Sequence, residues 1–179
     1  MEVVMKKWSA MLLLAILVVV DQVTKYIASV CLQGKDAFVI IKNVLEFRYL
    51  EGGNTGAAFG VLEGKTVALG VVSVVVSIVL LVVYLKISGM EKYKGVSLAL
   101  LFMIAGAVGN GIDRLVHQYV IDFIYVKAIN FPIFNVADCY VTLAAVALFL
   151  LIAFDDDEEE KKLEQEREKR LEQEQEVEK

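Results

Sequence analysis

Four long stretches of apolar residues, separated by more polar connections, dominate the hydrophobic pattern of this chain. A helix that crosses a bilayer needs roughly 20 consecutive, mostly apolar residues. Each stretch reaches that length, so each predicts a transmembrane helix. The helices are expected at about residues 8–32, 66–85, 96–116 and 135–154. The pattern therefore predicts a mainly α integral membrane protein.

Two longer connections, residues 33–64 and 117–134, lie on the same side of the predicted membrane. Within the first, Ala37–Ile41 and Val44–Leu50 are rich in β-branched and aromatic residues with partial alternation, which is typical of short strands. Glu51–Asn54 follows as a turn signal. We expect a small β-rich element on this face of the membrane.

Basic residues near the ends of the helices predict the orientation, because Lys and Arg are enriched in cytoplasmic loops. The side with both termini has five of them close to the helices, and the side with the longer connections has four, so the bias is modest. We expect both termini in the cytoplasm and the longer connections outside. The first set is Lys6, Lys7, Lys86, Lys92 and Lys94, and the second is Lys35, Lys42, Arg48 and Lys127.

The first apolar stretch also has features of a secretory signal peptide, since Lys6 and Lys7 precede it. It leads into Asp21–Lys25, however, and not into a cleavage site of small residues. Cys31 follows Val30, where a lipidation signal has a small residue. We therefore interpret this stretch as a retained helix.

The composition separates a membrane body from a charged tail. Hydrophobic residues make up 58% of the chain, mean hydropathy is +0.61 and the net charge is −5. Residues 155–179 hold 13 acidic and 6 basic residues out of 23 and 18, which leaves the body with 10 and 12, a net of +2. We expect one membrane domain, 1–154, and an acidic cytoplasmic tail that is a solvated helical extension or disordered. Three apolar residues in the tail are too few for a coiled coil.

Several function classes lack their usual signals. Cys31, Cys139 and His117 form no recognisable set of metal ligands, so no metal or other cofactor is expected. A disulfide framework is implausible with one possible pair. The chain has no phosphate-binding glycine loop and no basic, aromatic-interleaved patch for nucleic acid.

Polar residues within the predicted helices gather at one depth, near the outer face. Such residues are costly in a membrane and are candidates for function. Asn110 and Asp113 are three positions apart, as are Asn135 and Asp138, so each aspartate has an amide on the same helix face. Asp21, Lys25, Asn54 and Arg114 fall at the same depth.

Two aspartates on facing helices predict acid–base chemistry. If the carboxyl groups of Asp113 and Asp138 lie close together, they share one proton because both cannot ionise readily. One then takes a proton from water and the other donates one, as in aspartic proteases. Asp122, in the second outer connection, is interpreted as a positioning residue.

Structural roles also fit these residues. Asp113 and Arg114 could form an interfacial charge pair, and the helix dipole could favour Asp138 near its N-terminus. The position of Asp21 and Lys25, away from both helix ends, favours a structural pair over chemistry.

Five short motifs resemble those of one known family, the lipoprotein signal peptidases, also called signal peptidase II. Their order and spacing fit over about residues 5–154. The motifs are Asp21–Lys25 (DQVTK), Asn54–Phe59 (NTGAAF), Gly109–Arg114 (GNGIDR), Val120–Phe123 (VIDF) and Phe134–Asp138 (FNVAD).

The resemblance implies a monomeric aspartic endopeptidase of the bacterial cytoplasmic (inner) membrane with its active site near the outer face. Its substrates would be diacylglyceryl-modified prolipoproteins, cut just before the lipidated cysteine. The inhibitor globomycin would occupy the same cleft, and membrane lipid would be a further partner. The resemblance implies that Asp113 and Asp138 are catalytic, and that the site, substrate or inhibitor is held by Asp21, Lys25, Asn54, Gly56, Asn110, Arg114, Asp122, Asn135 and Ala137.

The chain departs from the family pattern at Gln118, where glycine is usual, and at Ile129 and Asn130, where an aromatic residue is common. Two other classes stay open on the residues alone. Paired intramembrane carboxylates also serve ion transporters, but no internal repeat is visible and the polar residues gather at one face, not at the midplane. A membrane scaffold would leave the two Asn-x-x-Asp pairs unexplained.

Overall fold

The computed structural model describes residues 7–56 and 64–154, so the predicted acidic tail lies outside the described residues. The described part contains four helices long and apolar enough to cross a membrane. Three are α1 (Lys7–Leu32), α2 (Thr66–Ile87) and α3 (Lys94–Val116), and the fourth helix is Val136–Phe154. A 3-10 turn, η2 (Glu91–Tyr93), precedes α3. All four predicted spans are confirmed within a few residues at each end.

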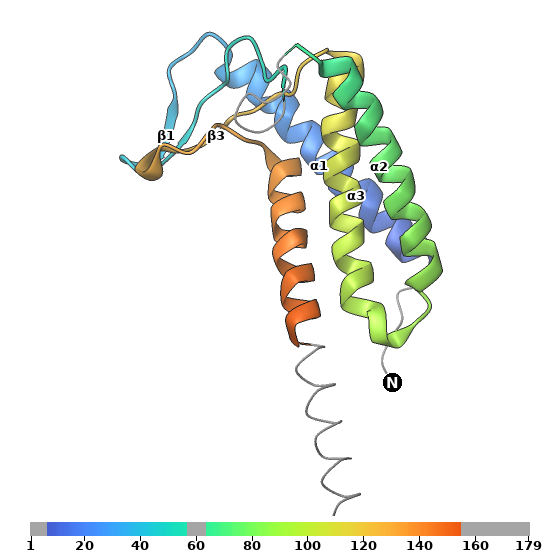
Figure 1. The fold of residues 1–179 in the computed structure, drawn as a ribbon. Coiled ribbons are helices and arrows are strands. Elements are labelled where there is room, and N and C mark those ends of the chain that lie inside the picture. The colour runs from blue at the N-terminus through green and yellow to red at the C-terminus, as the bar shows by residue number, and fades with distance from the viewer. Residues whose placement is uncertain (1–6, 57–63, 155–179) are drawn as a thin grey trace, which may run out of the picture.

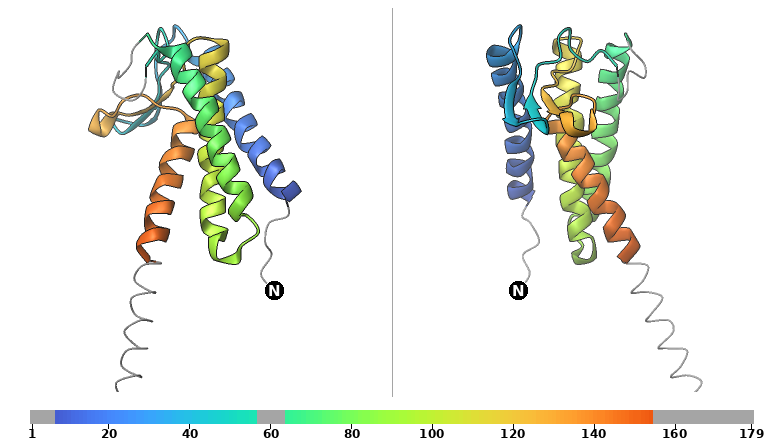
Figure 2. Two further views of the ribbon diagram at one scale, coloured as in Figure 1. Left: turned by 45° about the vertical axis from the view of Figure 1, so that its right-hand side comes forward. Right: turned by 90° about the vertical axis from the view of Figure 1, so that its left-hand side faces the viewer.

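Helix α3 lies at the centre of the bundle, with α1, α2 and the fourth helix around it (Figures 1 and 2). Half of its most apolar window is buried, against 11% in α2 and in the fourth helix. Small residues permit this central place. A side chain on Gly106 would meet the backbone of Ala137, and one on Gly70 of α2 would meet Leu115.

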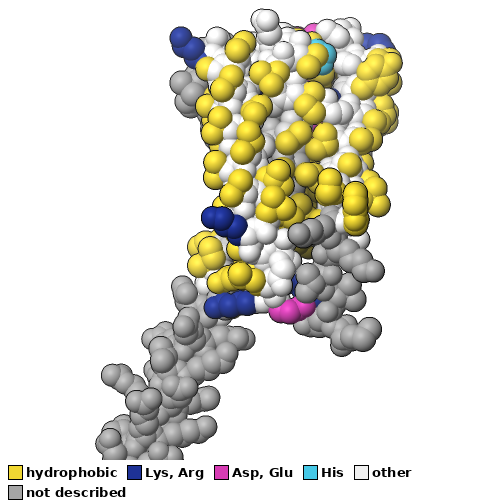
Figure 3. Space-filling model, turned by 90° about the vertical axis from the view of Figure 1, so that its right-hand side faces the viewer, with side chains coloured by type: hydrophobic (Ala, Val, Ile, Leu, Met, Phe, Trp, Pro, Cys, Tyr) yellow, Lys and Arg dark blue, Asp and Glu magenta, His cyan; other side chains and the backbone are white. Residues whose placement is uncertain are grey.

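The outer surfaces of the helices are apolar. Figure 3 shows hydrophobic side chains covering the α2 side of the bundle. Among the residues of α2, Val71, Val75 and Val79 are exposed. Such a surface is unfavourable in water and suits the hydrocarbon core of a bilayer. The protein is a multi-pass membrane protein.

A three-stranded antiparallel sheet lies at one end of the bundle, in the order β1 (Phe38–Ile41), β2 (Leu45–Phe47) and β3 (Ile124–Val126). The first two strands confirm the predicted β-rich element. The third comes from the second long connection, where no strand was predicted, and continues into the short 3-10 helix η3 (Lys127–Ile129). The sheet projects sideways from the bundle (Figure 1).

Both long connections fold back over this end of the bundle. Asn54 forms an antiparallel bridge with Val120, and Ile124 forms one with Phe134. The ends of α1 and of the fourth helix that lie nearest the chain termini are at the opposite end (Figure 1). The sheet and both connections therefore occupy one face, as the sequence predicted.

Candidate active site

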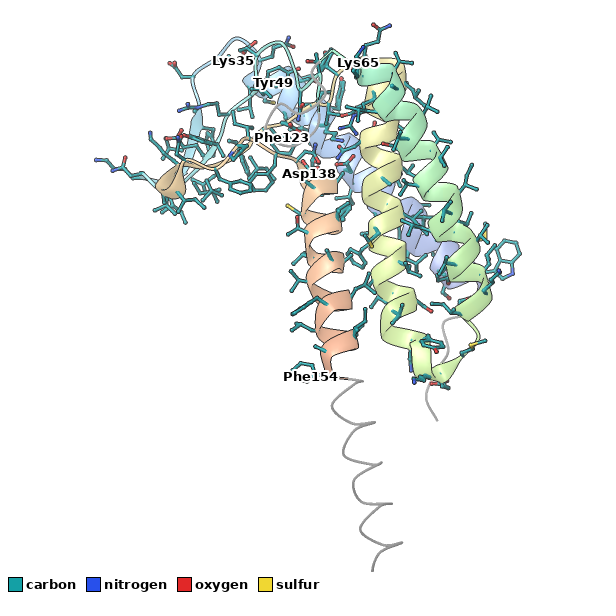
Figure 4. The ribbon with its side chains drawn as sticks, in the orientation of Figure 1. Lys35, Tyr49, Lys65, Phe123, Asp138 and Phe154 are labelled. Atoms are coloured by element: carbon teal, nitrogen blue, oxygen red, sulfur yellow. The ribbon has the colours of Figure 1, made fainter. Side chains whose placement is uncertain are left out.

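A cluster of polar side chains is almost completely buried at the end of the bundle where the two long connections fold back. Five of them are 2% exposed or less: Asp21, Lys25, Asp113, Asp122 and Asn135. They come from α1, α3, the second connection and the residue just before the fourth helix. Asp138 follows Asn135 by about one helical turn. Figure 4 shows Asp138 near the start of the fourth helix and Phe154 at its other end.

Lys25 is the centre of the buried part of the cluster. Its ammonium group lies 2.9 Å from Asp21 Oδ2 and 3.0 Å from Asp113 Oδ2. It also donates a hydrogen bond of 2.9 Å to Asn110 Oδ1. One cation from α1 thus pairs with a carboxylate of its own helix and with a carboxylate and an amide of α3.

The fourth helix begins with a reciprocal cap. Asn135 precedes the helix, and its Oδ1 accepts a bond of 3.0 Å from the amide of Asp138. In return, Asp138 Oδ2 accepts a bond of 3.1 Å from the amide of Asn135. This arrangement satisfies donors that have no partner within a helix, as in a capping box. The spacing of three between Asn135 and Asp138 therefore has a structural reason as well as a chemical one.

Asp21 reaches the same helix N-terminus from α1. Its Oδ1 accepts a bond of 2.8 Å from the amide of Ala137, a residue with no exposed surface. Gly109 makes this possible, because a side chain there would collide with Asp21 Oδ2. Asp21 consequently joins α1, α3 and the fourth helix at one point.

Asp113 is fully occupied by structural partners. Besides pairing with Lys25, its Oδ2 accepts a bond of 3.0 Å from the amide of Ile121, and its Oδ1 accepts one of 3.0 Å from Gln22 Nε2. Gln22 also donates to the carbonyl oxygen of Gly109. Its role was not predicted from the sequence, although a polar residue beside Asp21 in an apolar span was a usable signal.

Asp122 and Asp138 are held by a chain of amides. Asn135 Nδ2 donates to Asp122 Oδ1 at 2.6 Å, and Asn54 Nδ2 donates to Asp122 Oδ2 at 2.9 Å. Asn110 Nδ2 donates to Asp138 Oδ1 at 2.8 Å. Burial and the nearby charge of Asp138 raise the pKa of Asp122 from 3.8 to about 6. A carboxyl with this pKa can exchange a proton near neutral pH.

A cavity of about 1000 Å³ opens between α3 and the fourth helix beneath the two connections. Its polar lining residues include Asp122 and Asp138, and the described residues that line it do not include Asp113. Arg114 lines it as well, donating to the carbonyl oxygen of Gly56 at 3.2 Å, while its buried Nε has no hydrogen-bond partner among the described residues. Other lining residues are mostly apolar, among them Val120, Phe131, Pro132, Ile133, Phe134, Val141 and Leu143.

The structure gathers the eleven residues expected at the site, but into two groups. The buried group of Asp21, Lys25, Asp113 and Ala137 joins the helices. The second group, Asn54, Gly56, Asn110, Arg114, Asp122 and Asp138, lines the cavity, and Asn135 connects the two aspartates of that group. In residues 7–56 and 64–154, no group of three His, Cys, Asp or Glu side chains could hold a metal ion.

The fold and the cavity define a multi-pass membrane protein with a carboxylate-lined site between its helices. Residues 13–154 match the family model described as signal peptidase (SPase) II. The chain is 37% identical over 145 residues to a lipoprotein signal peptidase of Enterococcus faecalis, covering 81% of this chain and 88% of that protein. It is 39% identical over 146 residues to one from Caldanaerobacter subterraneus, covering 81% and 96%.

Two solved structures have the same fold. One, described as a bacterial membrane enzyme determined by the in meso method at 2.3 Å, has a TM-score of 0.74 at 30% identity, over 84% of this chain and 90% of the other. A second, at 1.9 Å, has a TM-score of 0.69 at 29% identity, over 82% and 93%. The chain belongs to the signal peptidase II family and is a peptidase.

Proposed function

We propose that this protein is a lipoprotein signal peptidase that acts as a membrane-embedded aspartic endopeptidase. It removes signal peptides from diacylglyceryl-modified prolipoproteins by cutting just before the lipidated cysteine. The observation that carries the proposal is that Asp122 and Asp138 line one cavity between the helices. The lipoprotein signal peptidases at 37% and 39% identity support the choice of substrate.

The proposed dyad is Asp122 and Asp138, and not the pair Asp113 and Asp138 expected from the sequence. Asp113 pairs with Lys25 and lies outside the described lining of the cavity, which favours a structural role. Asp122 lines the cavity, and Asn135 binds both it and Asp138. Its raised pKa fits a carboxyl that holds the proton of a shared pair.

In the proposed mechanism, ionised Asp138 takes a proton from a water molecule, whose oxygen attacks the scissile carbonyl. Protonated Asp122 then donates its proton to the amide nitrogen as the C–N bond breaks. The products are a carboxylic acid on the signal peptide and a free amine on the lipidated cysteine. The two aspartates have exchanged protonation states and reset by proton exchange with water.

The cavity also suits a substrate that is part peptide and part lipid. Arg114 offers its Nε, which has no partner within residues 7–56 and 64–154, to a carbonyl or ester oxygen. The apolar residues Phe131, Val141 and Leu143 provide a surface for acyl chains. We propose that membrane lipid and the inhibitor globomycin compete for this same cavity, and that the enzyme works as a monomer.

The enzyme is further proposed to lie in the bacterial inner membrane with both termini in the cytoplasm and the cavity near the outer face. A membrane-impermeant thiol reagent should then label a cysteine placed at Asp36, beside the sheet, in intact cells. It should not label one placed at Lys92, in the connection between α2 and α3. The reverse pattern would contradict this orientation.

Three asparagine variants test the dyad. Asp122→Asn and Asp138→Asn should each lower the release of signal peptide from a diacylated prolipoprotein in detergent by about 10²–10⁴-fold. Both should retain folded protein in thermal melting. Asp113→Asn should instead melt at a lower temperature, because it leaves Lys25 with one fewer buried partner.

Asp36→Asn, an exposed change in the same outer region, serves as the matched control. If Asp122→Asn cleaves at a near wild-type rate while a folded Asp113→Asn does not, the dyad is the one expected from the sequence. If all three variants cleave normally, the aspartic mechanism is wrong.

A further inference from the structure

A second ionic cluster lies on the sheet, outside the cavity. Glu46 of β2 is 2% exposed. Its Oε1 lies 2.6 Å from the ammonium group of Lys127, and its Oε2 lies 2.8 Å from Arg48 Nη2. The hydrogen bond from Lys127, with the charges of both cations, holds the pKa of Glu46 below its usual value. Arg48 also covers the ring of Tyr125 at 4.9 Å.

This cluster spans the pairing of β2 with β3. Glu46 is the cross-strand partner of Tyr125, and Lys127 follows β3 directly as the first residue of η3. The ion pair therefore connects one position of β2 to the segment that continues β3. A shift of the two strands by one residue would separate these charges.

The register matters because the same segment carries Asp122. The amide of Arg48 donates to the carbonyl oxygen of Phe123, and that of Leu50 donates to the carbonyl oxygen of Asp122. Successive side chains of a strand alternate in direction, so a slip by one residue moves each to the opposite face. Asp122 would leave the cavity, and apolar Ile121 or Phe123 would take its place.

The apolar pattern cannot specify this register. Val120, Ile121, Phe123 and Ile124 surround Asp122, so both directions of the segment are apolar. A strand with the same character on both faces has a weakly specified register. Buried charges are best attested where they fix register. Glu46 is placed to supply that specificity.

We propose that Glu46 is a positioning residue, which fixes the register of β3 against β2 through Lys127 and thereby keeps Asp122 in the cavity. This inference rests on the proposed function of Asp122. Loss of the Glu46 carboxylate should impair the chemical step more than substrate binding, because the cavity walls on α3 and the fourth helix are unchanged.

The first test is the kinetics of Glu46→Gln in detergent with a diacylated prolipoprotein. A displacement of about 1 Å at a catalytic group can lower the rate by about 10²-fold, so we expect kcat to fall by roughly 10- to 100-fold. KM should stay within about twofold, since only an interaction made in the transition state is lost. Asp36→Asn is the control of equal charge change. If Glu46→Gln does not fold, Lys127→Gln removes the same ion pair from its more exposed side.

The second test locks the register by other means. Phe47 and Ile124 are cross-strand partners on the opposite face of the sheet. Cysteines at both positions should form a disulfide only in the native register, because the bond requires the two Cα atoms within about 7 Å. In a protein that also carries Glu46→Gln, oxidation should restore kcat to within a few-fold of wild type. The same protein after reduction is its own control.

The yield of that disulfide is a readout independent of catalysis. It should be lower with Glu46→Gln than with Glu46 intact. Equal yields, a wild-type kcat for Glu46→Gln, or a formed disulfide that does not restore kcat would each overturn the inference. Absence of cleavage by the wild-type protein would instead contradict the proposed function, and the disulfide yields would still decide the role of Glu46.

Discussion

Lys25→Met is the change whose effect on stability the structure predicts most directly. The variant keeps an unbranched side chain but removes the charge that pairs with Asp21 and Asp113. These carboxyl groups are 0% and 1% exposed, so water cannot replace the lost cation. Removing one partner of a buried ion pair typically costs about 3–5 kcal/mol. For a chain of this length, each 1 kcal/mol lowers the melting temperature by about 2–4 °C, which predicts a loss of roughly 6–20 °C.

The assay is thermal unfolding of the purified protein in detergent, with Lys65→Met as a control at an exposed lysine. A compensated variant makes the test sharper. This variant adds Asp21→Asn and Asp113→Asn to Lys25→Met, which removes the two carboxylates left without a cation. It should recover part of the lost melting temperature. Recovery is incomplete, because Asp21 also binds the amide of Ala137. If Lys25→Met melts within about 2 °C of wild type, the ion pairs contribute less than about 1 kcal/mol to the free energy of unfolding. In that case the buried ion pairs do not hold the helices together.

Three further outcomes follow from the same geometry. The pKa of Asp122 is raised in the folded protein, so the folded state binds this proton more tightly than the unfolded chain does. The free energy of unfolding should therefore fall as pH rises from about 4 to about 6. Melting curves against pH should show this loss in the wild type and not in Asp122→Asn. Gly109→Ala should lower the melting temperature, since the new methyl group collides with Asp21, whereas Gly89→Ala, which faces open space, should not. Truncation after Phe154 should leave cleavage within a few-fold, since the tail is predicted to lie on the side opposite the cavity.

The membrane helices could be predicted from the sequence because length and apolarity alone set them. Strand β3 could not, because its three residues, Ile124–Val126, are too short a run to show the alternation typical of a strand. Its pairing with β2 also joins segments about 80 residues apart, and nothing local specifies such a contact.

The depth of the polar cluster was predictable for a similar reason. Rise along a helix is fixed, so position in a span gives depth. The rotation of each helix is not fixed in this way, and it decides that Asp113 faces Lys25 while Asp138 faces the cavity. Asp122 lies in a connection, where no helical rise sets its depth, so its place near Asp138 could not be predicted.

The charges of the site explain why one cluster contains so many aspartates. Lys25 contacts Asp21 and Asp113 at 2.9 and 3.0 Å, so one cation is shared by two carboxylates in the closed interior. That pairing joins α1 to α3 and orients Asn110, which in turn binds Asp138.

The cavity has the same ratio of one cation to two carboxyl groups, but its cation has different partners. Asp122 and Asp138 share the cavity with Arg114, whose guanidinium donates to the backbone carbonyl of Gly56. One cation beside two carboxyls leaves one negative charge uncompensated, and retaining a proton on Asp122 removes it. Lys25 contacts both carboxylates of its group directly, whereas Arg114 donates to a backbone carbonyl and the carboxyl groups of Asp122 and Asp138 are held by side-chain amides. The difference in partners supports the proposal that one group assembles the helices and the other performs acid–base chemistry.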